Sequence, residues 1–225
     1  MNLAELLSAP PKVHEWNPGD LTSSGLPEQT FKFMDEVLSP ETRSVETGMG
    51  ISTALFAMKG CKHTCVNPDT DEIQRLKDYC TKNNISYANM TFLAKRSDEV
   101  WFDLKDKTWD FVLVDGCHGF PIPFMDWYFL CMGLKVGGYV VIDDTPIVTG
   151  GILKEFLMTE GAWKLIEPLS PKTAVFKKVA DFNMNNEWIR QPYVIAKTKE
   201  LEEARKPLPM DFVSRAKRKL IKILS

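Results

Sequence analysis

The chain has 225 residues, of which 44% are apolar and 11% aromatic, so it can bury a full core and is not disordered. Its formal net charge of -2 lacks the basic excess of nucleic-acid-binding proteins, so we expect no nucleic-acid partner. Five cysteines, an odd number, favour reduced thiols over a disulfide framework. No signal peptide or membrane span is expected, and together these features predict a cytoplasmic protein.

Residues 1–26 are rich in Pro, Ser and Gly and show no clear hydrophobic period, which predicts an N-terminal arm. A helix is expected over residues 27–38, where Phe31, Met34 and Leu38 recur at helical spacing. Strands and helices then alternate. The expected strands are residues 43–47, 63–67, 91–94, 110–115 and 139–143, and the expected helices are residues 52–59, 70–83, 97–104 and 122–133. This alternation predicts an α/β fold, a doubly wound, mostly parallel sheet with helices on both faces.

The last part of the predicted domain has a different pattern. A helix near residues 150–159 precedes two β-like runs, residues 163–167 and 173–179, which a short break separates. This pattern predicts a terminal hairpin, and therefore a seven-stranded sheet with an antiparallel last strand, in a domain over residues 27–180.

Residues 181–225 are polar and charged, and we expect them to form a C-terminal appendage. Within it, residues 212–224 place apolar side chains on one helical face and basic side chains on another. This amphipathic helix is expected either to contact an anionic surface or partner, or to pack on its own domain. A homo-oligomeric assembly is left open.

Two glycines follow the first strand of the alternation. Gly48 and Gly50 allow a sharp turn and a close approach of the backbone to a ligand, and Ser52 or Thr53 is placed to cap the next helix. A nucleoside-bearing cofactor fits such a turn. A dinucleotide fingerprint would need a third glycine where Thr53 stands, so a nicotinamide-dependent oxidoreductase is the less favoured alternative.

Polar side chains also follow the second strand. Asn67 and Asp69 lie at the sheet edge beside the glycine turn, where a ligand in the crevice could present a ribose diol. Either residue is a candidate for binding that diol.

Residues 46–50, Glu-Thr-Gly-Met-Gly, resemble the first motif of the class I S-adenosylmethionine methyltransferases, and the resemblance extends over roughly Gly25 to Val179. Residues 110–115 match that family's fourth strand, and Gly137-Gly138 before residues 139–143 match its fifth. The resemblance implies S-adenosylmethionine as cofactor. It implies that Glu46 and the glycine turn hold the methionine portion, that Asn67 or Asp69 holds the ribose and that Ser97 holds the adenine edge. The implied cofactor-binding set comprises Glu46, Thr47, Gly48, Gly50, Ser52, Asn67, Asp69, Ser97 and Asp115. The family usually has an acidic residue where Asn67 stands.

Three carboxylates are expected at one edge of the sheet. Asp115 follows one strand, and Asp143 and Asp144 end the next. They repel one another unless a cation lies between them, and oxygen ligands suit Mg²⁺, Ca²⁺ or Mn²⁺ better than zinc. The alternative is that these aspartates only cap or order their own loops.

The acidic cluster is similar to that of the metal-dependent small-molecule O-methyltransferases of the catechol and macrocin types. This likeness implies a magnesium ion held by Asp115, Asp143 and Asp144. It also implies that His118 acts as the base, with Asp115 beside it as a second catalytic residue.

The sequence therefore predicts an S-adenosylmethionine-dependent O-methyltransferase with a divalent metal and a histidine base. The expected acceptor is a small hydroxylated molecule such as a sugar or glycoconjugate, and the sequence does not identify it. A methyltransferase-like fold that only binds, without catalysis, is the non-enzymatic alternative.

Overall fold

The computed structural model describes residues 1–166, 170–183 and 186–205 of the chain. The chain divides into two compact units, Met1–Met184 and Asn185–Ser225. The second unit contains the short helix η2 (Trp188–Arg190) and helix α8 (Pro192–Ala204). The amphipathic helix expected over residues 212–224 lies outside the described residues. Among those that are described, no helix has the length and apolar character needed to cross a membrane.

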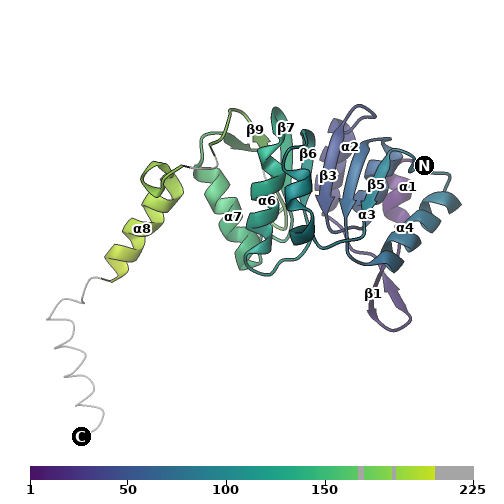
Figure 1. Cartoon of the computed structure of the whole chain (residues 1–225). Helices are drawn as coiled ribbons and strands as arrows, with labels where there is room; N and C mark the ends of the chain where they lie inside the picture. Colours follow the sequence, from purple (N-terminus) through teal and green to yellow (C-terminus); the bar gives the residue numbers. More distant parts are fainter. Residues whose placement is uncertain (167–169, 184–185, 206–225) are drawn as a thin grey trace, which may run out of the picture. The chain divides into compact units, whose positions relative to one another are not determined.

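The first unit is a seven-stranded sheet with helices on both faces (Figure 1). Its strands are β3 (Arg43–Thr47), β4 (Lys62–Val66), β5 (Met90–Leu93), β6 (Trp109–Val114), β7 (Leu134–Ile142), β8 (Trp163–Leu165) and β9 (Ala174–Lys178). Its helices are α1 (Leu3–Ser8), α2 (Glu28–Val37), α3 (Ile51–Met58), α4 (Thr70–Lys82), η1 (Ser97–Glu99), α5 (Trp101–Leu104), α6 (Ile122–Met132) and α7 (Val148–Thr159). A separate two-stranded hairpin consists of β1 (His14–Asn17) and β2 (Asp20–Thr22).

The strand order is β5-β4-β3-β6-β7-β9-β8. Strands β3 to β7 are parallel to their neighbours in this set, whereas β9 runs antiparallel to both β7 and β8. The predicted doubly wound sheet with an antiparallel terminal strand is therefore confirmed. The chain builds outward from β3 through β4 to β5 and then returns to β6 on the other side of β3. The carboxyl ends of β3 and β6 thus form the topological switch point, where α/β sheets bind ligands.

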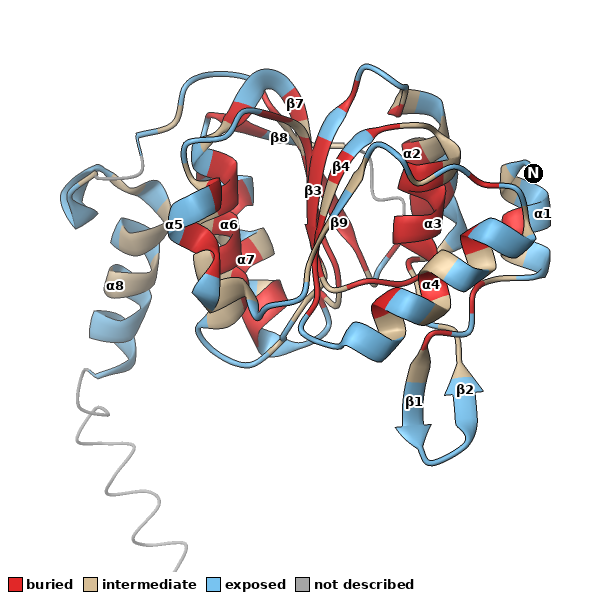
Figure 2. Ribbon diagram, turned by 45° about the vertical axis from the view of Figure 1, so that its right-hand side comes forward, coloured by how far each residue is buried: buried red, intermediate tan, exposed pale blue. Residues whose placement is uncertain are grey.

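The core has two layers, one on each face of the sheet (Figure 2). On one face, α1 to α4 pack around Phe31, Met34, Phe56 and other buried side chains. On the other face, α5 to α7 pack around Trp127 and Leu153. Because both faces are covered, the central strands β3 and β6 are buried along most of their length with little alternation, as is usual for parallel strands.

The predicted helices and strands begin and end within about two residues of the observed ones, with three exceptions. The helix expected over residues 97–104 is divided into η1 and α5. Strand β7 begins at Leu134, because Gly137, with a φ of +93°, lies inside the strand and does not end it. The third difference is the N-terminal segment.

The N-terminal segment, expected as an arm without a hydrophobic period, contains a helix and a hairpin. Helix α1 begins with a capping box between Asn2 and Glu5. Leu6 and Val13 are fully buried in the same core as α2 and α3. The hairpin β1–β2 projects from this part of the molecule with most of its residues exposed (Figure 2). The segment was not predicted because α1 has only six residues, fewer than two turns, so no period develops.

Candidate active site

The turn after β3 brings two strand ends into close contact. Gly48 follows Thr47 with a φ of +83°, and a Cβ atom at Gly48 would lie 2.1 Å from the carbonyl oxygen of Asp115. The amide of Asp115 donates to the carbonyl of Thr47 at 3.2 Å. Position 48 therefore requires glycine, for its left-handed backbone and because the end of β6 leaves no room for a side chain.

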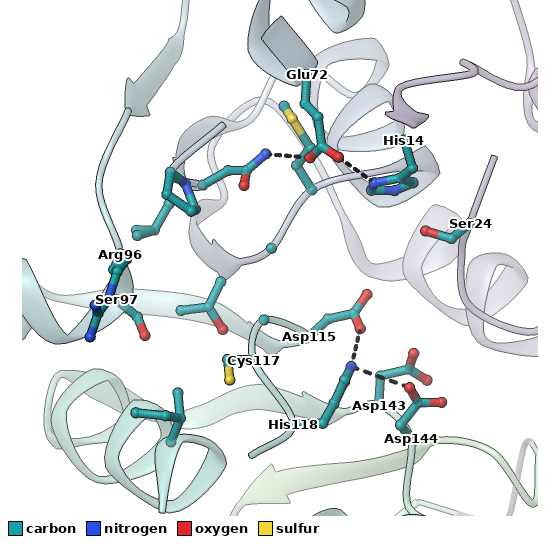
Figure 3. A pocket seen from close by; sticks show the side chains of 18 of the residues that line it. His14, Ser24, Glu72, Arg96, Ser97, Asp115, Cys117, His118, Asp143 and Asp144 are labelled. Atoms are coloured by element: carbon teal, nitrogen blue, oxygen red, sulfur yellow. Dashed lines mark hydrogen bonds and ion pairs between the residues drawn. The ribbon is translucent and has the colours of Figure 1, made fainter. Parts of the chain in front are cut away.

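A cavity of about 620 Å³ opens at the carboxyl ends of β3, β4, β6 and β7 (Figure 3). Its size falls within the range of small-molecule and cofactor sites. The sequence-predicted residues that line it are Thr47, Gly48, Asn67, Ser97, Asp115, His118, Asp143 and Asp144. The structure thus brings the ends of four strands and the predicted base to one site.

Four other predicted residues do not line the cavity. Glu46, on β3, is buried in the core, where its carboxylate accepts from Ser52 Oγ at 2.8 Å and lies 3.1 Å from His63 Nε2. A Cβ at Gly50 would lie 2.9 Å from the carbonyl oxygen of Ser24, so this glycine makes room for the N-terminal segment. Glu46 and Ser52 satisfy each other in the core.

Of the two candidate ribose ligands, Asn67 lines the cavity and Asp69 does not. Asp69 is the N-cap of α4, and its side chain accepts from the amides of Asp71 and Glu72 at 2.8 and 3.0 Å. Asn67 lines the cavity, and its Nδ2 donates to Glu72 Oε2 at 2.8 Å.

Two lining residues that sequence reasoning missed form a pair across the cavity wall. His14 Nδ1, on β1, lies 2.8 Å from Glu72 Oε1, on the first turn of α4 (Figure 3). The position of Glu72, one turn into the helix that follows a strand end, was a signal that it could reach this edge. His14 carried no such signal, because the hairpin that positions it was not predicted.

A lysine that the sequence analysis also missed lies beside the three carboxylates. Lys172, just before β9, places Nζ 3.1 Å from Asp143 Oδ2 and 3.5 Å from Asp144 Oδ1. Burial lowers the pKa of Lys172, but the neighbouring carboxylates outweigh burial and raise it overall. Lys172 therefore remains an ammonium group. Burial, followed by the charge of Asp143, raises the pKa of Asp115 well above its usual range.

His118 lies beside the same carboxylates. Its Nε2 is 3.2 Å from Asp144 Oδ2 and 4.0 Å from Asp115 Oδ1, and about a third of the side chain (33%) is exposed (Figure 3). Thr149 Oγ1 donates to the His118 carbonyl at 2.7 Å and fixes the loop. A carboxylate oxygen can only accept, so Nε2 carries the hydrogen in the pair with Asp144, and the nitrogen that could accept a proton is Nδ1.

The expected metal ligands do not fit a divalent cation as they lie. Within the described ranges, no group of three or more His, Cys, Asp or Glu side chains is arranged to hold a metal ion. Lys172 instead supplies the positive charge against Asp143, whose side chain is only 3% exposed. An ion bound by Asp143 and Asp144 would have to displace this ammonium group. The repulsion that suggested a metal is relieved by a residue that precedes β9, the antiparallel neighbour of β7.

Comparison with known proteins shows what this part of the chain is similar to. Residues 45–145, from β3 through the end of β7 to the carboxylate cluster, match a family model described as a methyltransferase domain. This part of the chain is similar to a methyltransferase domain. The expected resemblance to the class I methyltransferases is thereby confirmed, and the Gly48 turn, His118 and all three carboxylates lie inside the matched region. No curated protein sequence matches the chain.

Solved structures with this methyltransferase fold differ widely in sequence. A caffeoyl-CoA O-methyltransferase-like protein from Staphylococcus aureus has 14% identity and a TM-score of 0.59, covering 69% of this chain and 86% of its own. The O-methyltransferase TomG from Streptomyces achromogenes, solved with S-adenosylmethionine, has 12% identity and a TM-score of 0.56, covering 69% and 82%. An rRNA methylase from Streptococcus thermophilus has 16% identity and a TM-score of 0.54, covering 70% and 100%. At these identities the likeness shows the fold.

Proposed function

We propose that this methyltransferase domain transfers a methyl group from S-adenosylmethionine to a hydroxyl group of a small acceptor. The observation that carries the proposal is a single cavity that joins the Gly48 turn to His118. One end of the cavity can hold a nucleoside-bearing ligand, and the other end holds a base beside carboxylates. The match of residues 45–145 to a methyltransferase domain supports this assignment.

In this proposal the carboxyl ends of the strands hold the cofactor. The backbone at Thr47 and Gly48 approaches the methionine portion, Asn67 faces the ribose, and Ser97 lies at the adenine edge. S-adenosylmethionine supplies an electrophilic methyl group on a sulfonium centre. The absence of a third glycine at Thr53, whose Oγ1 accepts from the amide of Gly50 at 3.0 Å, disfavours a dinucleotide pyrophosphate at the same turn.

His118 is proposed as the general base. A hydroxyl group is a weak nucleophile at neutral pH, and His118 Nδ1 would accept its proton as the oxygen forms a bond to the methyl carbon. When bound, S-adenosylmethionine would supply the methyl group, and its sulfur would keep the electron pair of the broken bond as S-adenosylhomocysteine forms. Asp144, 3.2 Å from Nε2, orients the ring and stabilises the imidazolium that forms.

Lys172 supplies the positive charge beside the carboxylates that the sequence analysis assigned to a metal ion. Its ammonium group neutralises Asp143 and Asp144, so Asp144 can pair with His118 without a bound cation. We therefore propose that turnover does not require a divalent metal.

The acceptor is proposed to be a small hydroxylated molecule, such as a sugar or glycoconjugate. Two of the structurally similar proteins named above are described as O-methyltransferases or as similar to them, which supports an oxygen acceptor. The rRNA methylase with the same fold has a different acceptor class, so the fold alone does not choose between them. The net charge of -2 favours a small molecule over RNA.

Methyl transfer from radiolabelled S-adenosylmethionine to panels of catechols, sugars and glycosides tests this proposal. We expect labelled product with at least one hydroxylated class, and loss of labelling in the His118→Ala variant. Labelling confined to amine or thiol acceptors would overturn the assignment of an O-methyltransferase.

A further inference from the structure

A second cavity, of about 520 Å³, opens on the face of the sheet that α5 packs against. Between β5 and β6 the chain forms only the short helices η1 and α5, and α5 has four residues, whereas α4 has 13. Four residues of helix extend about 6 Å and 13 extend about 20 Å. Helix α5 therefore leaves part of β4 and β5 uncovered, and the register partners Thr64 and Thr91 are half-buried and exposed.

This cavity, which we call the basic groove, is separate from the candidate active site. The two cavities have no lining residue in common. The basic groove has an apolar floor, to which the buried side chains of Val100, Leu104 and Trp109 and the half-buried Leu93 contribute. Its volume falls within the range of small-molecule sites.

The rim of the groove is strongly basic. The charged side chains that line it are four cations and one carboxylate, namely Arg43, Lys62, Lys95, Lys107 and Asp103. Arg43 and Lys62 are register partners that begin β3 and β4, so they share a face about 4.8 Å apart. Lys107 precedes β6, the other neighbour of β3. Three cations therefore lie where three adjacent strands begin.

These cations have little neutralising charge of their own. Lys62 lies 3.7 Å from Glu41, but both side chains are more than half exposed, and such a pair contributes little. Within the part of the chain that the structure describes, no ion pair engages Arg43, Lys95 or Lys107. A local excess of positive charge in a chain with a net charge of -2 favours an anion.

The carboxylate beside Arg43 is already neutralised. Asp110 accepts from the backbone amide of Arg43 at 2.9 Å and from Lys135 Nζ at 2.6 Å. It therefore holds the start of β3 against β6 and leaves the guanidinium group of Arg43 available to a ligand.

We propose that the basic groove binds a small phosphate monoester. The phosphate group lies between Arg43, Lys62 and Lys107, and the organic group lies on the apolar floor. A phosphate monoester carries close to two negative charges at neutral pH, and a guanidinium group can donate to two of its oxygens at once. The apolar floor favours an ester over inorganic phosphate, because burial of the organic group adds to the affinity.

Titration calorimetry with phenyl phosphate tests the proposal, using the full chain at about 0.15 M salt. Inorganic phosphate, which lacks the ring, and phenol, which lacks the charge, are the matched ligands. We expect saturable binding of one phenyl phosphate per chain, weaker binding of inorganic phosphate and no measurable binding of phenol. If phenyl phosphate does not bind, or if phenol binds equally well, the proposal is overturned.

Four variants locate the bound phosphate. Arg43→Gln and Lys107→Gln should each weaken phenyl phosphate binding about tenfold, which is the usual loss for one hydrogen bond to a charged group. Thr91→Glu places a carboxylate at this exposed position of the groove and should abolish binding. Thr91→Gln, of the same size but without the charge, should retain most of it.

Two further variants serve as controls. Lys82→Gln removes an exposed lysine at the end of α4, outside the groove, and should leave the affinity unchanged. Lys172→Gln should also leave it unchanged, because Lys172 lines the other cavity. Loss of binding in Lys172→Gln with no change in Lys107→Gln would place the phosphate in the active-site cavity and overturn this inference. Equal losses in Lys82→Gln and Lys107→Gln would reduce it to a nonspecific effect of charge.

Discussion

Gly48→Ala tests whether the ends of β3 and β6 are as close as the structure shows. The φ of +83° costs a residue with a Cβ about 1 to 2 kcal/mol. The added Cβ would lie 2.1 Å from the backbone carbonyl oxygen of Asp115, and the shift needed to relieve this contact costs about 1 to 3 kcal/mol more. We therefore expect a loss of about 2 to 5 kcal/mol in the free energy of unfolding, measured by urea denaturation.

Gly60→Ala is the matched control for this variant. Gly60 also has a positive φ, +72°, but a Cβ there would come no closer than 3.7 Å to its nearest neighbour, Pro40. The Gly60→Ala variant should lose only about 1 to 2 kcal/mol of the free energy of unfolding, which is the cost of the positive φ. If Gly48→Ala is destabilised no more than Gly60→Ala, the close approach of the two strand ends is refuted. The argument that this turn positions Asp115 at the cavity would fail with it.

Three other variants or conditions have defined outcomes. His118→Ala should lower turnover by ~10² to 10⁴ and leave the affinity for S-adenosylhomocysteine unchanged, and wild-type turnover would remove it as the base. Excess chelator should leave turnover unchanged because Lys172 neutralises the carboxylates, whereas loss of activity that Mg²⁺ restores would return those aspartates to a metal-binding role. Burial raises the pKa of Asp126, which accepts from Trp101 Nε1 at 2.7 Å, above its usual 3.8. The stability that the protonated Asp126 carboxyl contributes is therefore fully present below its pKa in the unfolded chain. It is lost as pH rises through its higher pKa in the folded chain. Asp126→Asn should flatten that decline in urea midpoints from pH 4 to 8, and parallel curves for the two proteins would contradict it.

The sheet could be predicted from sequence because its signals are local. Strands β6 and β7 contain apolar runs bounded by turn residues, and the helices between the strands show regular spacing. The glycine turn and the aspartates at Asp115 and Asp143 were located for the same reason. In a parallel sheet, residues that directly follow neighbouring strands meet at one edge.

The rest of the site depends on contacts between distant segments. Lys172 reaches the carboxylates only because β9 inserts between β7 and β8, and strand order is not encoded in any local pattern. His14 reaches Glu72 across 58 positions of the chain. Glu46 matched a motif at its position, yet its side chain points to the core and pairs with Ser52 and His63. Sequence spacing placed Glu46 near the site but could not show which way its side chain faces, and it did not identify Lys172 or His14.

The most direct test of the central claim is calorimetric titration of the full chain with S-adenosylhomocysteine and NAD side by side. The account predicts saturable binding of one S-adenosylhomocysteine per chain and no displacement by NAD, because the cavity at Gly48 accepts a nucleoside but lacks a dinucleotide fingerprint. Binding of NAD that excludes S-adenosylhomocysteine, or the absence of any S-adenosylhomocysteine binding by the folded protein, would contradict it.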